Sequence, residues 1–189
     1  MARRSGTGPS VPTALTGTPG TGKSSVAARL APRLPSVEVG KLARRLGAAT
    51  GSGRSVVVDV GRLNRRIRTR GWPAGVRLVV GHLAGRLPVR DVIVLRCRPI
   101  ELERRLARAG RGSADDRREN AVAEATDVVL LDSLRPGRRV WEVDTTGRSV
   151  DAVARAVARR LARRGPSRTG IVDWLGDARV TEHLLDRPP

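Results

Sequence analysis

The sequence predicts an α/β fold in which helices cover both faces of a parallel sheet. Three observations support this prediction. Short apolar runs alternate with segments of helical periodicity along most of the 189 residues. Two of these runs, 76–80 and 91–97, are apolar almost throughout, which is typical of strands buried on both faces. A glycine-rich turn at 16–25 joins the first apolar run to the first helical segment, the order expected of such folds.

The glycine-rich turn matches a phosphate-binding motif. It reads TGTPGTGKSS, and the pattern G-x-x-x-x-G-K-[ST] falls on Gly17, Gly22, Lys23 and Ser24. Glycines let the backbone N–H groups point inward at phosphate oxygens, the lysine reaches the β- and γ-phosphates, and the serine hydroxyl binds Mg²⁺. Only Lys23 and Lys41 are lysines in a chain rich in arginine. A compact ammonium therefore looks specifically required at position 23.

The composition limits the classes of partner. The chain has 37 lysines and arginines against 18 aspartates and glutamates, a formal charge of +19. This surplus suits a polyanion such as rRNA, but abundant arginine, alanine and glycine is also typical of a GC-rich genome, and both explanations stay open. With three Trp and neither Phe nor Tyr, the core must be aliphatic. Stacking of aromatic side chains on bases is nearly excluded.

The sequence has few features that bear on its cellular compartment or on membrane contact. Cys97 is the only cysteine, so an intramolecular disulfide is impossible. The basic N-terminal residues lack the apolar segment of a secretory signal, and no apolar run approaches the length that spans a membrane. We therefore expect a cytoplasmic protein without membrane contact.

The elements can be placed in order along the chain. We expect one domain over 11–164, preceded by a loose N-terminus at 1–10 and followed by a tail at 165–189 that holds a small packed piece near 172–175. The predicted strands are the apolar runs 11–15, 36–39, 76–80, 91–97 and 140–144. The predicted helices are 23–34, 41–49, 60–67, 99–106, 115–134 and 150–164, and 50–55 is a flexible connection.

Four pieces of sequence, in this order, resemble the archaeal adenylate kinase family of broad-specificity nucleoside monophosphate kinases. This family is related to the eukaryotic nuclear adenylate kinase isoenzyme of small-ribosomal-subunit maturation. The resemblance covers about 11–175, including tail segments at 144–147 and 172–175. The four pieces are LTGTPGTGKS at 15–24, EVGKLAR at 38–44, VGHLA at 80–84, and REN at 118–120 followed by Glu124.

The resemblance implies an adenylate-kinase-like fold and a Mg²⁺-dependent transfer of phosphate from ATP to a nucleoside monophosphate, with some ATPase activity. It also implies a role in small-subunit assembly and rRNA maturation, with small-subunit ribosomal protein eleven and subunit precursors as partners. The ATP phosphates would be bound by Gly20, Gly22, Lys23, Ser24 and Ser25. The monophosphate segment would be 38–61, with Glu38, Gly40, Lys41 and Asp59, and the lid 108–118.

The sequence departs from the family pattern at three places. Val80 stands where an acidic residue is expected two positions before His82. Asp59 is either a stand-in for that acid or the cap of the following helix. The acid-rich insert expected after position 49 is missing. The lid arginine position falls on Ala109, so either Arg108 or Arg111 would have to serve.

Several interpretations therefore stay open. The leading hypothesis is a monophosphate kinase in which Lys23 is catalytic and His82 contributes, although a histidine after a strand is often structural. The second is a nucleotide-binding assembly module with weakened catalysis, and the third is a small-molecule kinase with another acceptor. Arginine clusters at 65–70, 104–111 and 155–164 suggest contact with rRNA or simply reflect composition.

Overall fold

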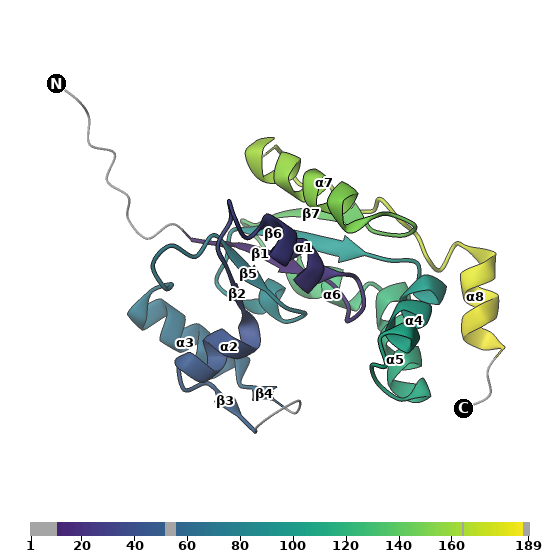
Figure 1. Ribbon diagram of the computed structural model, residues 1–189, viewed down its shortest axis with the longest axis horizontal. Coiled ribbons are helices and arrows are strands. Elements are labelled where there is room, and N and C mark those ends of the chain that lie inside the picture. The colour runs from purple at the N-terminus through teal and green to yellow at the C-terminus, as the bar shows by residue number, and fades with distance from the viewer. Residues whose placement is uncertain (1–10, 52–55, 164, 187–189) are drawn as a thin grey trace.

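A parallel sheet forms the centre of the molecule (Figure 1). The computed structural model describes residues 11–51, 56–163 and 165–186. The five strands of the sheet lie in the order β2-β5-β1-β6-β7, and all neighbouring pairs are parallel. They are β1 (Thr13–Thr16), β2 (Ser36–Glu38), β5 (Leu78–Val80), β6 (Asp91–Arg96) and β7 (Arg139–Asp144). This arrangement confirms the predicted α/β fold.

Helices cover both faces of the sheet, as the apolar strands predicted. One face packs against α1 and α7, and the other packs against α2, α3 and α6. A small antiparallel hairpin, β3 (Ala49–Thr50) with β4 (Val57–Val58), projects beside α2. The helices are α1 (Lys23–Leu30), α2 (Val39–Arg45), α3 (Val60–Arg70), the 3₁₀ turn η1 (Ala84–Arg86), α4 (Pro99–Arg108), α5 (Ala114–Ala125), α6 (Val128–Ser133), α7 (Val150–Arg163) and α8 (Ala178–Leu185).

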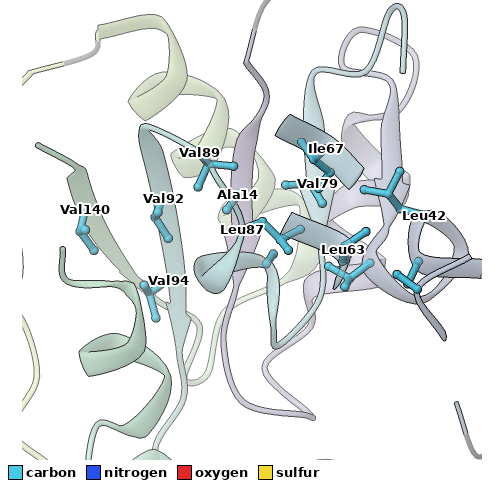
Figure 2. Packing of buried hydrophobic residues seen from close by; sticks show 14 of the residues in the cluster. Ala14, Leu42, Leu63, Ile67, Val79, Leu87, Val89, Val92, Val94 and Val140 are labelled. Atoms are coloured by element: carbon cyan, nitrogen blue, oxygen red, sulfur yellow. The ribbon is translucent and has the colours of Figure 1, made fainter. Parts of the chain in front are cut away.

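The strand register places alternate residues on opposite faces. Ala14 of β1 lies opposite Val79 of β5 and Val92 of β6. These three residues belong to the core on the α2–α3 face, where Leu42 and Leu63 also pack (Figure 2). Burying each larger aliphatic side chain contributes about 1.5–3 kcal/mol, so this core fixes the position of α2 and α3 against the sheet.

Trp141 anchors the opposite core. It is 1% exposed and packs with residues of β1, α1 and α7. Its indole Nε1 donates to the carbonyl oxygen of Pro166 at 2.6 Å, and the Arg160 guanidinium lies 5.6 Å from the ring centroid. Pro166, which follows α7 in the chain, is therefore hydrogen-bonded to the central sheet.

One predicted helix is wrong in its extent. The sequence predicted a single helix over 115–134, but the structure divides it into α5 and α6. The break occurs at Asp127, which has φ 59 and is the one non-glycine residue with positive φ among the described residues. Its carboxylate pairs with the buried Arg96. This long-range ion pair, which local periodicity does not report, accompanies the left-handed turn.

The tail is more ordered than the sequence predicted. Residues 178–185 form α8, which packs against α4 and α5 near the right-hand edge of Figure 1. Three polar contacts hold it: His183 Nε2 lies 3.0 Å from Glu103 Oε2, Arg98 pairs with Asp177 at 2.7 Å, and Arg118 donates to the carbonyl oxygen of Leu184. Part of the expected tail is therefore packed against the domain through α8.

Some expectations concern residues outside the described part of the chain. The loose N-terminus at 1–10 and most of the connection at 50–55 are among them, since the description resumes at residue 56. The first helix ends at Leu30 rather than 34, two residues before Pro32, which has no N–H to continue the helical hydrogen bonds. In the described part of the chain, no helix is both long and apolar enough to cross a membrane.

Candidate functional site

The glycine-rich loop between β1 and α1 has the backbone that its sequence requires. Gly17, Gly20 and Gly22 have φ of 143°, 94° and 90°, values that side-chain-bearing residues rarely adopt. A Cβ atom at Gly17 would also lie 2.4 Å from the carbonyl oxygen of Leu95. The loop therefore passes directly over the end of β6, and a methyl group at position 17 would displace it.

Lys23 lies at the first turn of α1 and reaches back over the loop. Its Nζ donates to the carbonyl oxygens of Gly17 and Thr18 at 2.7 and 2.8 Å. Burial lowers the pKa of Lys23 to about 8, Glu124 opposes this shift, and Arg111 adds to it. The ammonium is thus held where the loop curls, and an anion at the loop would favour its charged form.

A buried ion network anchors the loop from below. The Thr18 hydroxyl donates to Glu124 Oε2, and Glu124 Oε1 accepts from Arg96 Nε at 2.8 Å and from the Cys97 N–H at 3.1 Å. The Arg96 guanidinium, 1% exposed, also pairs with Asp127 and Glu142. The network connects the loop, the end of β6 and the junction of α5 and α6.

Sequence reasoning missed this network. Glu124 entered the sequence analysis only as part of the resemblance, and Arg96 only as one residue of the predicted strand 91–97. The available signal was an arginine within a strand predicted to be buried on both faces, because a fully buried arginine needs carboxylate partners.

A cavity of about 490 Å³ opens beside the loop. The loop and the start of α1 form one wall, residues 38–40 and the valines of the β4 region form another, and residues 80–83 form the floor. Arg105, Leu106, Ala109 and Arg111 close the remaining side. The volume is in the range of ordinary small-ligand sites.

The cavity brings most of the predicted site residues together and leaves three outside. The lining residues among the candidates are Gly20, Gly22, Lys23, Ser24, Ser25, Glu38, Gly40, His82 and Arg111. The candidates that do not line it are Lys41, Asp59 and Arg108. Of the two arginines considered for the lid, Arg111 lines the cavity and Arg108 does not.

The three candidate residues that do not line the cavity lie at the ends or on the surface of α2, α3 and α4. Asp59 caps α3, with its Oδ1 accepting from the Arg62 N–H at 2.8 Å. Lys41 is exposed on α2 and lies 3.6 Å from Glu38. Arg108 is the last residue of α4. The geometry of Asp59 is that of the helix cap considered as its alternative role.

Val80 and His82 lie at the carboxyl end of β5. Val80 is 3% exposed and lines the cavity, so no carboxylate comes from this position. The loop after it is fixed by the Thr16 hydroxyl, which donates to the carbonyl oxygen of His82 at 3.0 Å. Burial lowers the pKa of His82, and the charges of Lys23 and Arg86 lower it further. Both effects favour the neutral imidazole.

The donor set for a metal ion is small. Glu38 is the one carboxylate among the described residues that line the cavity, and its side chain is turned toward Lys41 at the surface. No group of three or more His, Cys, Asp and Glu side chains suited to a metal occurs in the part of the chain that the structure describes. The Ser24 hydroxyl follows Lys23 at the start of α1 and lines the cavity. A hard cation held by Ser24 would take its remaining ligands from a phosphate and from water.

Comparisons with known proteins agree with this geometry. A family model described as an AAA domain matches residues 14–127. A protein of Thermococcus onnurineus named "Putative adenylate kinase" is 37% identical over 174 residues, 90% of this chain and 96% of its own length. A protein of the same name from Archaeoglobus fulgidus is 40% identical over 172 residues, 87% of this chain and 92% of its own.

Among solved structures, an uncharacterized protein from Eubacterium ventriosum shares the fold, with a TM-score of 0.51 at 13% identity over 80% of this chain and 98% of its own. Identity above a third over almost the full length, together with the phosphate loop and its cavity, decides the classification. The chain belongs to the archaeal adenylate kinase family, and its residues 14–127 match the AAA domain.

Proposed function

We propose that this protein transfers the γ-phosphate of ATP to a nucleoside monophosphate, AMP in the first instance, and hydrolyses ATP slowly. The observation that carries the proposal is the cavity, in which Lys23 and the phosphate loop face residues 38–40 and 80–83 across about 490 Å³. Such a cavity has room for two phosphate-bearing ligands to approach one another. The names of the relatives from Thermococcus and Archaeoglobus point to the same reaction.

The residues of the cavity suit phosphoryl transfer. The loop backbone at Gly20 and Gly22 presents N–H groups to phosphate oxygens, and Lys23 neutralises the charge that builds up during transfer. In the proposed lid at 108–118, Arg111 is placed to close over the phosphates. The neutral His82 donates or accepts one hydrogen bond at the floor of the cavity without adding charge.

We propose that Mg²⁺ enters together with ATP. The Ser24 hydroxyl would be its protein ligand, and the remaining ligands would be phosphate oxygens and water. When bound, the ion supplies charge neutralisation at the phosphates. The small donor set of the cavity fits a metal that arrives with the nucleotide, because Mg²⁺ commonly keeps several waters.

The direct test measures ADP formation from ATP plus AMP by the purified chain. We expect turnover that falls about 10²–10³-fold in Lys23→Ala, because a preorganised charge at the transferred phosphate is lost. Arg155→Ala is the matched control, since Arg155 is exposed on the outer side of α7 and outside the cavity. Equal activity of Lys23→Ala and the native chain would overturn the assignment of Lys23.

A nucleotide-binding assembly module with weakened catalysis is the second candidate function, and Val80 supports it. A buried valine at this position supplies no acidic group to hold water on a metal. Calorimetric ATP affinity and turnover, measured on the same preparation, separate the two candidates. Tight binding without turnover favours the module, and recovery of activity in Val80→Asp would locate the cause. A screen of small-molecule acceptors tests the third possibility, a kinase with a different substrate.

We also propose a role in small-ribosomal-subunit assembly for the cytoplasmic protein. The exposed arginines on the outer side of α7, Arg155, Arg159 and Arg163, support contact with rRNA; Arg164 lies outside the described residues. Titration with rRNA fragments should give an affinity whose logarithm falls with log salt by roughly 0.7–0.9 per phosphate contact. Weak, salt-independent binding would contradict contact with rRNA. Co-purification with small-subunit ribosomal protein eleven, or its absence, tests the protein partner.

A further inference from the structure

A second cavity, of about 370 Å³, lies between α3, η1, α6 and the turn before β7. It shares no lining residue with the nucleotide cavity. We call it the arginine cleft, because four of the residues that line it are Arg68, Arg86, Arg135 and Arg138. The loop at 81–88 connects the two cavities, with His82 at the first and Arg86 at the second.

The arginine cleft has a surplus of positive charge. Its four guanidinium groups face one carboxylate, that of Asp132. Asp132 is already occupied by Arg86, whose Nε lies 2.8 Å from Asp132 Oδ2. Three positive charges therefore remain without a neutralising group among the lining residues.

The guanidinium of Arg138 is held in place. It donates to the carbonyl oxygens of Gly85 and Leu87, the latter at 2.7 Å, and it is half-buried. Burial lowers the pKa of Arg138, and the charge of Arg135 lowers it further. The fold thus keeps two like charges close together at an energetic cost, which an anion between them would relieve.

Two of the arginines are available to a ligand. The side chains of Arg68 and Arg135 are exposed and have no hydrogen bond or ion pair with another described residue. They come from different elements, α3 and the turn after α6, and both line the cleft with the fixed Arg138. Guanidinium groups converging from separate elements match the several oxygens of a phosphate chain, to which arginine binds through paired N–H groups.

We propose that the arginine cleft binds an oligophosphate anion, the linked phosphate chain of a small molecule. The cavity is concave and of ligand size, and its arginines come from α3, η1 and the turn between α6 and β7. This proposal is independent of the reaction at the phosphate loop. It assigns a role to arginines that composition alone would leave as solvated surface.

The test is calorimetric titration with sodium tripolyphosphate at fixed salt. Since the phosphate loop also binds anions, the titration is made in the Lys23→Ala chain. Adding Arg68→Ala and Arg135→Ala to this chain should weaken its affinity for tripolyphosphate at least tenfold. The reason is the loss of charge-assisted hydrogen bonds to the anion. Arg45→Ala with Arg179→Ala is the matched control, because both side chains are exposed outside the cavities, and removing the same charge there should change the affinity less than about twofold.

Two further measurements keep the result decisive. In the chain that retains Lys23, the number of tripolyphosphate ions bound should fall from two to one in the cleft variant, and circular dichroism should show an unchanged fold. An equal loss of affinity in the control with Arg45→Ala and Arg179→Ala would overturn the proposal, because net charge alone would then explain binding. The small-anion proposal would equally be overturned if the cleft variant lost affinity for a short single-stranded RNA while the parent bound no tripolyphosphate.

Discussion

The two walls of the nucleotide cavity are built differently. The phosphate loop rests on a buried network in which Thr18, Glu124 and Arg96 are joined by hydrogen bonds and ion pairs. The opposite wall, formed by residues 38–40 and the β3–β4 hairpin, has instead a surface ion pair at 3.6 Å, Glu38 with Lys41, and two-residue strands whose Val57 is 69% exposed. The phosphate loop is fixed before any ligand arrives. On the opposite wall α2 is buried against the sheet, and the hairpin is held by few contacts.

This difference has a physical consequence for phosphoryl transfer. Preorganised charge at the transferred phosphate accelerates a reaction only if it does not rearrange during the reaction. In the proposed reaction the opposite wall must admit and release the second substrate. The two-residue strands of the hairpin have few buried residues, so displacing them costs little free energy. We infer that motion on ligand binding is concentrated at the hairpin rather than at α2 or the phosphate loop.

The largest expected effect comes from breaking the buried network. Glu124→Ala should lower the free energy of unfolding by about 3–5 kcal/mol, because it leaves the buried Arg96 short of a partner and frees the Thr18 hydroxyl. Glu38→Ala, which breaks the exposed pair on the other wall, should cost less than about 1 kcal/mol. Urea unfolding of both variants measures the difference, and equal losses would show that the two walls are equally anchored.

The next effect tests the close approach of the loop to β6. Gly17→Ala should destabilise the fold by about 2–4 kcal/mol, since the new methyl group meets the Leu95 carbonyl oxygen and the residue keeps a positive φ. Thermal unfolding at neutral pH measures this change. A Gly17→Ala protein as stable as the native chain would mean that the loop shifts at little cost, contrary to the anchored wall described above.

The affinity for ATP should depend on pH through Lys23 of the phosphate loop. Because the pKa of Lys23 is about 8 in the free protein, most molecules carry neutral Lys23 at about pH 9. Bound phosphates favour the ammonium, so ATP binding at that pH should take up close to one proton, and affinity should fall by up to about tenfold for each pH unit above 8.

Calorimetry in two buffers of different ionisation enthalpy counts the protons taken up. The Lys23→Met chain is the control, because it has no group at this position to titrate. Absence of proton uptake by the native chain at high pH would contradict the assignment of this pKa to the binding site.

The smallest expected effect is a gain in stability from a substitution in α2, on the wall opposite the phosphate loop. Gly40 lies in the first turn of α2, has no positive φ, and has open space where a Cβ atom would stand. Gly40→Ala should therefore raise the stability by about 0.4–1 kcal/mol, since it restricts the unfolded chain without a clash. Thermal unfolding of Gly40→Ala and Gly17→Ala compares the effect of the same added methyl group on the stability of the two walls. A loss of stability in Gly40→Ala would contradict the open space at this position.

The sequence by itself determined the elements whose signals are local. Strand runs, helical periodicity and the spacing of Gly17, Gly22 and Lys23 depend on neighbouring residues, and they were sufficient to predict the α/β fold and the phosphate loop. The motif alone also indicated Ser24, since a hydroxyl after the lysine is part of the pattern. The bounds of α3 and β6 followed within a few residues.

Only the tertiary structure decided which distant side chains meet. It brought Arg96 to Glu124 and Asp127, divided the predicted helix at 115–134, and placed Arg111 rather than Arg108 at the cavity. It also gathered Arg68, Arg135 and Arg138 from separate elements into one cleft. Ion pairs and cavities depend on distances between residues far apart in the chain, and local periodicity carries no information about those distances.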